Sequence, residues 1–277
     1  MMRAQRSWPV LLALAVFLPA PALAQSATKT RPVDVLVKPA APEEPRNRIE
    51  ANYEYEHFTQ GDLSDWHWFS VEYHHRFDWG TLIPRVNWAR RFDQSAFQYE
   101  IDAYPRLTQH TYLYLNAGVA EESFFPKRRY GADIFWSLPK AFEASAGARR
   151  LEFDGKNVNI LTGSVGYYHG NYYFAARPWI SSKPGDTSVS LSLMMRRYYA
   201  TRHDYWTVRV GGGQGSDSDQ TIDQLITNNH AGATFEWQKL LHKVWIVKAK
   251  GGFEWYDFET GTTREGWLAG AGLARLF

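Results

Sequence analysis

The chain has 277 residues, and its 31 Lys and Arg nearly balance its 29 Asp and Glu, which leaves a formal net charge of +2. This small and scattered charge excludes a basic nucleic-acid-binding surface. Cysteine is absent, which excludes disulfides, thiolate metal sites and cysteine nucleophiles.

Residues 1–24 are typical of a signal peptide for export. Arg3 and Arg6 supply a positive start, 8–18 is a short apolar run, and Ala-Leu-Ala at 22–24 is a cleavage pattern. The run is too short for a spanning helix, so an uncleaved anchor is the less favoured alternative. We expect a mature chain that begins at Gln25.

Residues 25–46 are expected to form a periplasmic linker, because four prolines between Pro32 and Pro45 are spread among charged residues. Within it, Val-Asp-Val-Leu-Val at 33–37 is faintly similar to the peptide by which some outer-membrane transporters engage an energy-coupling partner. Those transporters need a plug domain and a barrel of about 22 strands, so an extended tail is the preferred interpretation.

From residue 47 onward, apolar and polar residues alternate with a period of two, which predicts β-strands. At 97–104, for example, Phe97, Tyr99 and Ile101 alternate with residues that include Glu100 and Asp102. Such alternation places each set on one face of a sheet. No run after the signal peptide reaches the roughly 18 apolar residues that a membrane helix needs.

Charge tells the two faces apart. Glu72, Arg85 and Glu100 lie on the polar face of their segments, and placing Arg or Lys on a lipid face costs about 2–4 kcal/mol. We therefore expect the apolar face to meet lipid and the polar face to enclose a lumen. Charges in the apolar set, such as Arg90 and Arg150, lie near segment ends, where snorkelling to the interface is tolerated.

We predict fourteen strands, with twelve as the alternative. The segments are 47–58, 66–78, 81–93, 95–107, 110–123, 127–138, 141–153, 157–169, 171–182, 187–199, 204–213, 229–240, 243–257 and 263–277. This leaves about 16 residues for each strand and its connection, which fits a membrane strand of roughly 9–11 residues and a turn. A soluble sandwich or propeller is the alternative fold, but its strands average about 5–6 residues.

The connections differ in length according to their order. Those after even-numbered segments are short, and several after odd-numbered segments are longer and more polar. The longer ones are 59–65, 123–126, 182–186, 214–228 and 258–262. Short periplasmic turns, longer surface loops and periplasmic termini are typical of a single antiparallel outer-membrane barrel. The cell outer membrane is thus the expected location, with lipid and lipopolysaccharide as surroundings.

The C-terminus is expected to be the signal read by the barrel-assembly machinery. Phe277 is a terminal aromatic residue, and Leu273, Ala271 and Ala269 continue the apolar alternation before it. Arg275 departs from this pattern, because an aromatic or aliphatic residue is usual at that position.

Two specific patterns occur in the chain, Tyr-Pro-Arg at 104–106 and Phe-Pro-x-x-Arg-Tyr-Gly at 125–131. Together with the stretches 99–107, 137–139, 142–145, 168–172 and 196–199, they resemble the YaiO-type outer-membrane β-barrel proteins. The resemblance covers essentially 47–277; it implies an outer-membrane barrel and transfers no catalytic residues. Family members often carry helical repeats before the barrel, where this chain has only the short linker.

The sequence offers weak candidates for two kinds of chemical site, a hydrolytic active site and a calcium site. Enzymatic barrels pair a nucleophile with a base and an orienting group; His57 and His67 flank the first loop near Asp65, with no serine at a matched depth. His74 and His75 cannot form a metal pair, because neighbouring strand residues face opposite sides. A lipid- or lipopolysaccharide-acting hydrolase therefore remains the alternative to a non-enzymatic barrel.

A calcium site is the second possibility. Asp217, Asp219 and Asp223 lie in the loop 214–228, and oxygen ligands spaced two apart could hold Ca²⁺. The glycine and bidentate glutamate of a calcium loop are not at their spacings, so a solvated acidic loop is preferred. We predict no metal and no cofactor.

The lumen set is the preferred functional candidate. It consists of Glu72, Arg85, Glu100, Asp102, Arg106, Arg129, Asp133, Glu143, Arg177, Arg196, Arg209, Glu236, Lys248, Lys250 and Glu254. Inward tyrosines are expected beside them, namely Tyr104, Tyr112, Tyr114, Tyr198 and Tyr256. Such charges form structural ion pairs where they are buried together and set pore selectivity where they meet water. Because aromatic rings with Arg and Glu suit sugars, the sequence predicts a non-enzymatic channel or docking barrel for a polar, saccharide-like solute.

Overall fold

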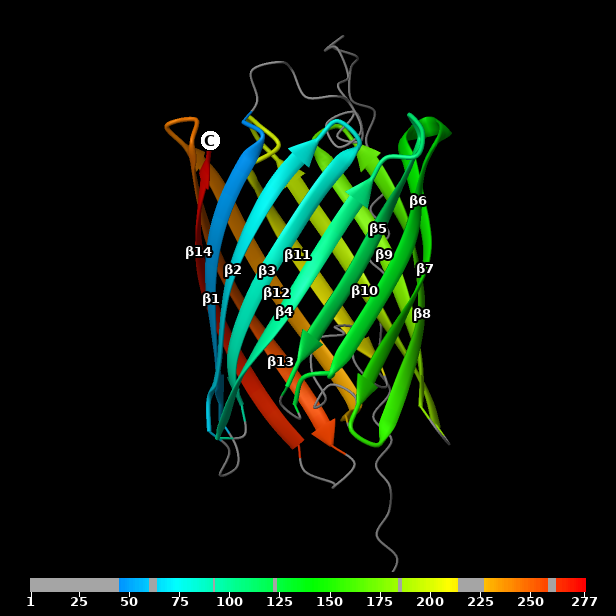
Figure 1. The fold of residues 1–277 in the computed structure, drawn as a ribbon, viewed down its shortest axis with the longest axis vertical. Coiled ribbons are helices and arrows are strands. Elements are labelled where there is room, and N and C mark those ends of the chain that lie inside the picture. Colours follow the sequence, from blue (N-terminus) through cyan, green and yellow to red (C-terminus); the bar gives the residue numbers. More distant parts are fainter. Residues whose placement is uncertain are drawn as a thin grey trace, which may run out of the picture.

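The computed structural model describes residues 45–59, 64–91, 93–121, 124–183, 186–213, 227–258 and 263–277. Within these ranges, fourteen antiparallel strands close into one barrel (Figure 1). The strands are β1 (Asn47–Phe58), β2 (Trp66–Phe77), β3 (Gly80–Arg91), β4 (Gln94–Pro105), β5 (Thr111–Ala120), β6 (Arg128–Leu138), β7 (Phe142–Phe153), β8 (Lys156–His169), β9 (Tyr172–Lys183), β10 (Asp186–Tyr198), β11 (Tyr205–Gly213), β12 (Thr227–Leu241), β13 (Trp245–Phe258) and β14 (Thr263–Leu276). The predicted signal peptide and residues 25–44 of the predicted linker lie outside the described residues.

The barrel closes where β1 pairs with β14. The last residue takes part, because the backbone N–H groups of Asn47 and Phe277 each donate to the other's carbonyl at 3.0 Å. The first residue of β1 and the last residue of the chain therefore lie at the same end of the barrel, which we call the termini end. The opposite end is the loop end. No helix in the part of the chain that the structure describes is long and apolar enough to cross a membrane.

The strand prediction is confirmed. All fourteen expected segments are strands, with ends that differ by at most three residues, and the alternative of twelve strands is excluded. The largest difference is at β5, which ends at Ala120 and not at 123. Four residues later the chain turns inward, since Phe124 and Phe125 are buried.

The prediction from loop length is only partly correct. Most turns at the termini end are short, such as 78–79 and 170–171, but the connection 199–204 between β10 and β11 has six residues. The longest connections, 59–65, 121–127 and 214–226, are at the loop end. The connection predicted as a longer loop at 182–186 is wrong, because β9 and β10 are separated by only two residues. Tight hairpins also join β3 to β4 and β7 to β8.

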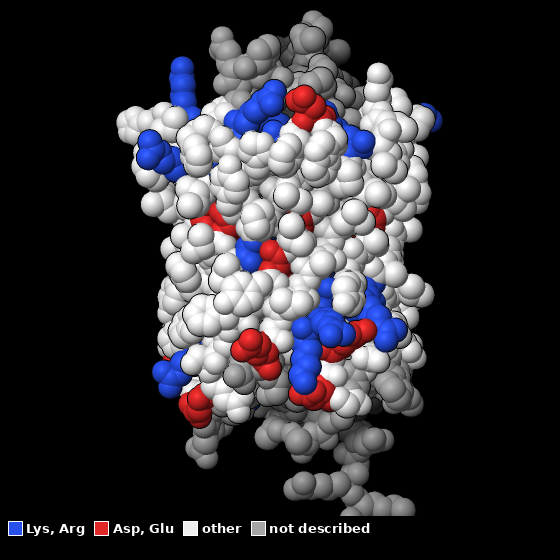
Figure 2. Space-filling view, in the orientation of Figure 1, with Lys and Arg blue, Asp and Glu red and all other residues white. Residues whose placement is uncertain are grey.

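The barrel is apolar on its outer face and polar on its inner face, which is the reverse of a soluble protein. On β4 the exposed side chains are Phe97, Tyr99 and Ile101, and the buried ones are Gln98, Glu100 and Asp102. Figure 2 shows the consequence on one face, where the middle is mostly uncharged and the Lys, Arg, Asp and Glu residues gather towards the two ends. An exposed apolar band with a polar interior is the arrangement of a membrane barrel and excludes a sandwich. Arg90 and Arg150 lie near strand ends, as expected.

The turn between β10 and β11, at the termini end, is organised by Asp204, which is buried. Its carboxylate accepts hydrogen bonds from the hydroxyl of Thr201 (2.6 Å) and the backbone N–H of Leu240 (2.9 Å), and it lies 3.4 Å from Nζ of Lys239. Burial alone would raise the pKa of this carboxyl, but the three donors outweigh burial and hold the pKa below its usual value.

Replacing Asp204 by asparagine is expected to lower the free energy of unfolding by about 1.5–3 kcal/mol at neutral pH, because charge-assisted hydrogen bonds are lost. The pKa is lower in the folded state than in the unfolded state. The ionised carboxylate therefore stabilises the fold above roughly pH 4, and this contribution is lost as the pH falls through the folded-state pKa. Urea unfolding in lipid vesicles should show the difference between wild type and D204N shrinking in acid; a constant difference would contradict this account.

Candidate functional site in the barrel lumen

A polar cavity of about 350 Å³ lies inside the barrel, between β1–β6 on one side and β12–β14 on the other. Its charged lining includes Glu54, Glu72, Arg85, Glu100, Glu236, Lys248 and Lys250, and its aromatic lining includes Trp68 and Tyr114. The volume falls at the lower end of the roughly 300–1,000 Å³ that small-molecule sites occupy. The lining comes from inward positions of nine strands, so the closure of the sheet creates the site.

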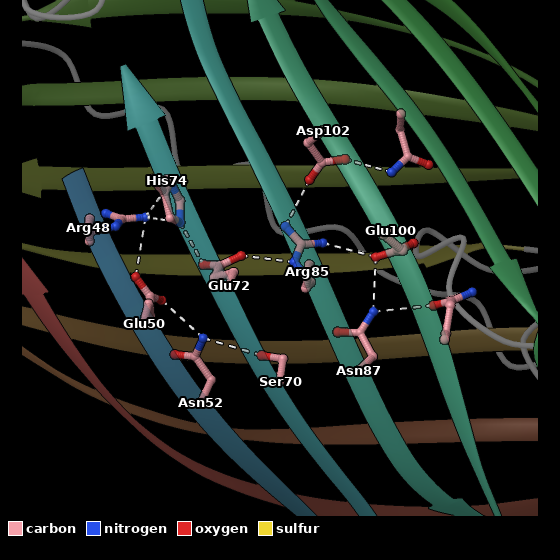
Figure 3. A network of polar contacts seen from close by, with 12 residues as sticks. Arg48, Glu50, Asn52, Ser70, Glu72, His74, Arg85, Asn87, Glu100 and Asp102 are labelled. Atoms are coloured by element: carbon pink, nitrogen blue, oxygen red, sulfur yellow. Dashed lines mark hydrogen bonds and ion pairs between the residues drawn. The ribbon is translucent and has the colours of Figure 1, made fainter. Parts of the chain in front are cut away.

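Arg85 on β3 is the centre of the polar network on this wall. Its guanidinium contacts three carboxylates at once: Glu72 on β2 (2.9 Å), and Glu100 (3.1 Å) and Asp102 (2.8 Å) on β4 (Figure 3). The three carboxylates are buried, and the Arg85 side chain is 26% exposed. One arginine therefore holds three acids beside the cavity.

The network continues towards the termini end through β1. Glu50 is paired with Arg48 (3.2 Å), and His74 lies 3.1 Å from Glu72 (Figure 3). Glu50 is also paired with Lys248 of β13. Ligand-type atoms of Glu50, Glu72 and His74 lie within 4.8 Å of one another. Because Arg48, Lys248 and Arg85 already occupy the two carboxylates, this group is an ion-pair cluster and does not fit a metal.

A second centre lies on β6. The Asp133 carboxylate accepts from Arg149 (3.1 Å) and from Arg177 of β9 (3.3 Å). Arg129, also on β6, reaches back to Glu100 at 2.7 Å. The ion pairs therefore form a nearly continuous belt from β13 through β1 to β9, in which most charges have an opposite charge as neighbour.

Glycines on the inner face make room for this belt. Glu100 and Arg129 meet above Gly118 of β5, where an added Cβ would lie 2.9–3.0 Å from both side chains. Lys250 and Glu54 are separated by β14 and meet over Gly270 at 3.0 Å. A side chain at either position would separate partners that are two strands apart.

Gly147→Ala is expected to lower the free energy of unfolding by about 1–3 kcal/mol. The new Cβ would overlap the Asp133 carboxylate and lie 2.7 Å from the carbonyl oxygen of Ala132. Asp133 cannot move away freely, because it is buried and held by two arginines. Gly251→Ala is the matched control, since its nearest atom would be 3.9 Å away. Equal urea midpoints for G147A and G251A would contradict the packing argument.

The predicted lumen residues divide by exposure. Those that are buried are Glu72, Glu100, Asp102, Arg129, Asp133 and Glu143. Those that are partly exposed are Arg85, Arg106, Arg177, Arg196, Glu236, Lys248, Lys250 and Glu254, and Arg209 is exposed. Arg106 lies at the termini-end rim, donating to the Asp78 carbonyl. Sequence reasoning missed Arg48 and Arg149, although the strand alternation places both on the inner face.

The loop end of the lumen is lined by buried hydrophobic side chains, of which sequence reasoning placed only Tyr256 in the lumen. One cluster contains Leu151, Phe153, Val158, Ile160 and Trp179, a second Phe58, Trp66 and Tyr256, and a third Ala89, Ala96, Phe124 and Phe125. Arg91 stacks over Trp66 at 4.3 Å. In the third cluster, Phe125 packs edge-on against Trp68 at 5.5 Å. Two phenylalanines before a proline in a polar loop were the available signal.

The residues considered for other chemistry do not assemble a site. His57 Nδ1 lies 2.9 Å from Asp65 on the outward face, and Tyr55 donates to the same carboxylate. No hydrogen bond joins His57 to a serine among the described residues. His74 faces the lumen, and His75 faces outward and packs edge-on against Phe77. The weak calcium candidates at 217, 219 and 223 lie outside the described residues.

The residues of the predicted C-terminal signal lie on the outward face of β14. Phe277 and Leu273 are exposed on the outward face at 54% and 50%, and Ala269 and Ala271 are exposed between the strand neighbours. Arg275 shares this face and stacks on Trp245 at 5.5 Å. Recognition by the assembly machinery stays a prediction.

The architecture resembles that of solved outer-membrane proteins. A bacterial polysaccharide outer membrane secretin aligns with a TM-score of 0.55 and 5% identity, over 84% of this chain and 99% of that chain. The outer membrane protein Omp33 of Acinetobacter baumannii gives 0.49 and 10%, over 84% and 99%. The outer membrane channel DcaP of the same organism gives 0.47 and 9%, over 83% and 96%.

Sequence comparison identifies the family. A search of curated proteins finds no significant match. The model of the YaiO membrane beta barrel domain matches residues 46–218, which is more than half of the chain. The protein is therefore an outer-membrane β-barrel and belongs to the YaiO membrane beta barrel domain family.

Proposed function

We propose that the barrel is a non-enzymatic channel or docking barrel for a polar solute of the saccharide class. The observation that carries this proposal is the cavity inside the barrel, whose lining combines paired charges with Trp68 and Tyr114. Ligand sites that combine apolar rings with a few fixed polar groups bind through both. A sugar has the matching chemistry, with C–H faces that stack on rings and hydroxyl groups that bond to carboxylates and guanidinium groups.

Two further observations support this assignment. The ion pairs hold Arg85 and its partners in place before any solute arrives, so little ordering is needed on binding. The secretin that shares the architecture handles polysaccharide according to its name. The main support is the lining of the lumen, because function resides in the site and not in the fold.

Planar-bilayer recording of the refolded protein tests the proposal. We expect steady ohmic current steps that a panel of oligosaccharides reduces in a concentration-dependent way. The alternative, a lipid- or lipopolysaccharide-acting hydrolase, predicts silent membranes together with acyl release from lipid vesicles. If the barrel conducted and no oligosaccharide changed its current, the protein would be a channel, but the assignment of a saccharide solute would be wrong.

Reversing one lumen charge is expected to change ion selectivity. Arg196 faces the lumen on β10, where Nε donates to Thr207 at 2.8 Å and the guanidinium stacks on Tyr205 at 4.0 Å. R196E should shift the reversal potential in a KCl gradient towards cation selectivity, because a fixed negative charge replaces a positive one. The next residue, Arg197, is exposed on the outward face, so R197E is the matched control. An unchanged reversal potential in R196E would place Arg196 outside the ion path.

A further inference from the structure

Seven of the inward-facing tyrosines gather on the inner wall at the termini end of the barrel, and Tyr256 lies in the loop-end cluster with Phe58 and Trp66. The seven lie within four residues of the termini end of their strands, namely Tyr104, Tyr112, Tyr114, Tyr168, Tyr173, Tyr198 and Tyr205. They come from β4, β5 and β8–β11 and share the inward register of Asp102, Arg177 and Arg196. We call these seven residues the tyrosine arc.

Most rings in the arc are open to the lumen. Tyr168 and Tyr205 are buried, and the other five are only partly buried. The phenylalanine and tryptophan side chains that form the loop-end clusters are instead buried, and Trp68, which packs against the third cluster, is partly buried. The arc therefore offers ring faces to a solute, whereas the aromatic residues at the loop end pack against one another.

The rings are held by neighbours within the wall. Tyr104 and Tyr114 have centroids 5.2 Å apart, and Tyr168 stacks on Tyr173 at 4.3 Å. Tyr112 stacks on Phe135, also inward-facing, at 4.7 Å with planes 4° apart. Because neighbours restrict the rings, little side-chain entropy remains to be lost on binding.

Polar groups stand among the rings. Glu143 accepts from the hydroxyl of Tyr173 at 3.0 Å, and Arg196 stacks over Tyr205 at 4.0 Å. Arg177 lies 5.8 Å from the ring of Phe135. Hydrogen-bonding groups of both signs therefore lie beside apolar ring faces, which is the combination that a pyranose ring requires.

We propose that the tyrosine arc, which meets the cavity at Tyr114, is the part of the lumen on which the saccharide stacks, and that the sugar is engaged from the termini end. The proposal rests on the proposed function, because it assumes that a saccharide enters the barrel. It adds the location, the binding mode and the side of entry. Sugar rings stack on the open tyrosine faces, and their hydroxyl groups bond to Glu143, Arg177 and Arg196.

Equilibrium titration of the full chain in detergent micelles tests the site without requiring conduction. Maltohexaose, chitohexaose and a hexameric galacturonate are the probes. Y104L and Y112L remove a ring and should weaken binding of the best probe about 3–10-fold, the range that an aromatic contact supplies. Y104F and Y112F keep the ring and should stay within about twofold.

Tyr99 provides the matched control, because it lies on the same strand as Tyr104, faces outward and is 54% exposed. Y99L should bind as wild type does. Heat-modifiable gel mobility establishes that each variant is folded. If Y104L and Y112L bound the probe as tightly as wild type does, the arc would not be the binding site, although the barrel would still bind a saccharide. If wild type conducted but bound none of the probes, the assignment of the arc would also be wrong.

The side of entry has its own measurement. In oriented single-barrel recordings, a probe added at the termini end should block the current at a higher rate than the same probe added at the loop end. Block that is as fast or faster from the loop end would contradict entry past the arc.

Discussion

Replacing Arg85 by alanine is expected to lower the free energy of unfolding by about 3–5 kcal/mol, because a buried charge that loses its partner is strongly destabilising. Arg85 is the only residue that contacts Glu72, Glu100 and Asp102 together among the described ion pairs. Its loss would leave like charges close to one another on β2 and β4. Urea titration of the protein folded into lipid vesicles, followed by tryptophan fluorescence, measures the change.

Arg209 provides the control, since it is an exposed inner-face arginine that contacts Sδ of Met194 at 3.6 Å. R209A should change stability by less than about 0.5 kcal/mol. Adding E72Q, E100Q and D102N to R85A should recover much of the free energy of unfolding that R85A loses, because these substitutions remove the uncompensated charges. If R85A and R209A unfolded at the same urea concentration, the network would contribute little to stability.

Phe125→Ala is expected to open the loop end of the lumen as well as destabilise it. Phe125 is 1% exposed and packs with Phe124 against Ala89 and Ala96. Truncating a buried phenylalanine costs about 3–5 kcal/mol. The cavity that remains lies at the inner face, so the single-channel conductance should rise while the urea midpoint falls.

The outward Phe97, which is 53% exposed, is the matched control. F97A should leave conductance unchanged, because its side chain meets lipid and not the lumen. A conductance equal to wild type in a folded F125A barrel would show that the β5–β6 loop does not restrict the path.

Most of the fold could be read from the sequence, for a physical reason that particular strands illustrate. Along β4, Phe97, Tyr99 and Ile101 alternate with Gln98, Glu100 and Asp102, and hydrocarbon tolerates only the first set. The alternation lies within a single strand, so it can be recognised without knowing which strands pair with it. The same reasoning placed the inner charges on the correct face before any contact was known.

The arrangement of the site was less accessible. Glu100 and Arg129 are adjacent in the lumen although β5 separates their strands, and their contact depends on Gly118 having no side chain. Strand register decides which inner residues share a level, and a pattern of period two carries no register between strands. The loop prediction at 182–186 was wrong for a related reason, since a polar stretch can continue as a strand.

The amino-acid sequence by itself determined that the chain forms a membrane barrel, how many strands it has and which side chains face inward, because lipid imposes a period-two rule on every strand separately. Only the tertiary structure decided that Arg85 holds three acids, that Phe124 and Phe125 turn into the loop end, and that tyrosines from β4 to β11 meet at the termini end. Those features join residues from different strands, and they form only when the sheet closes on itself and sets every strand at its register.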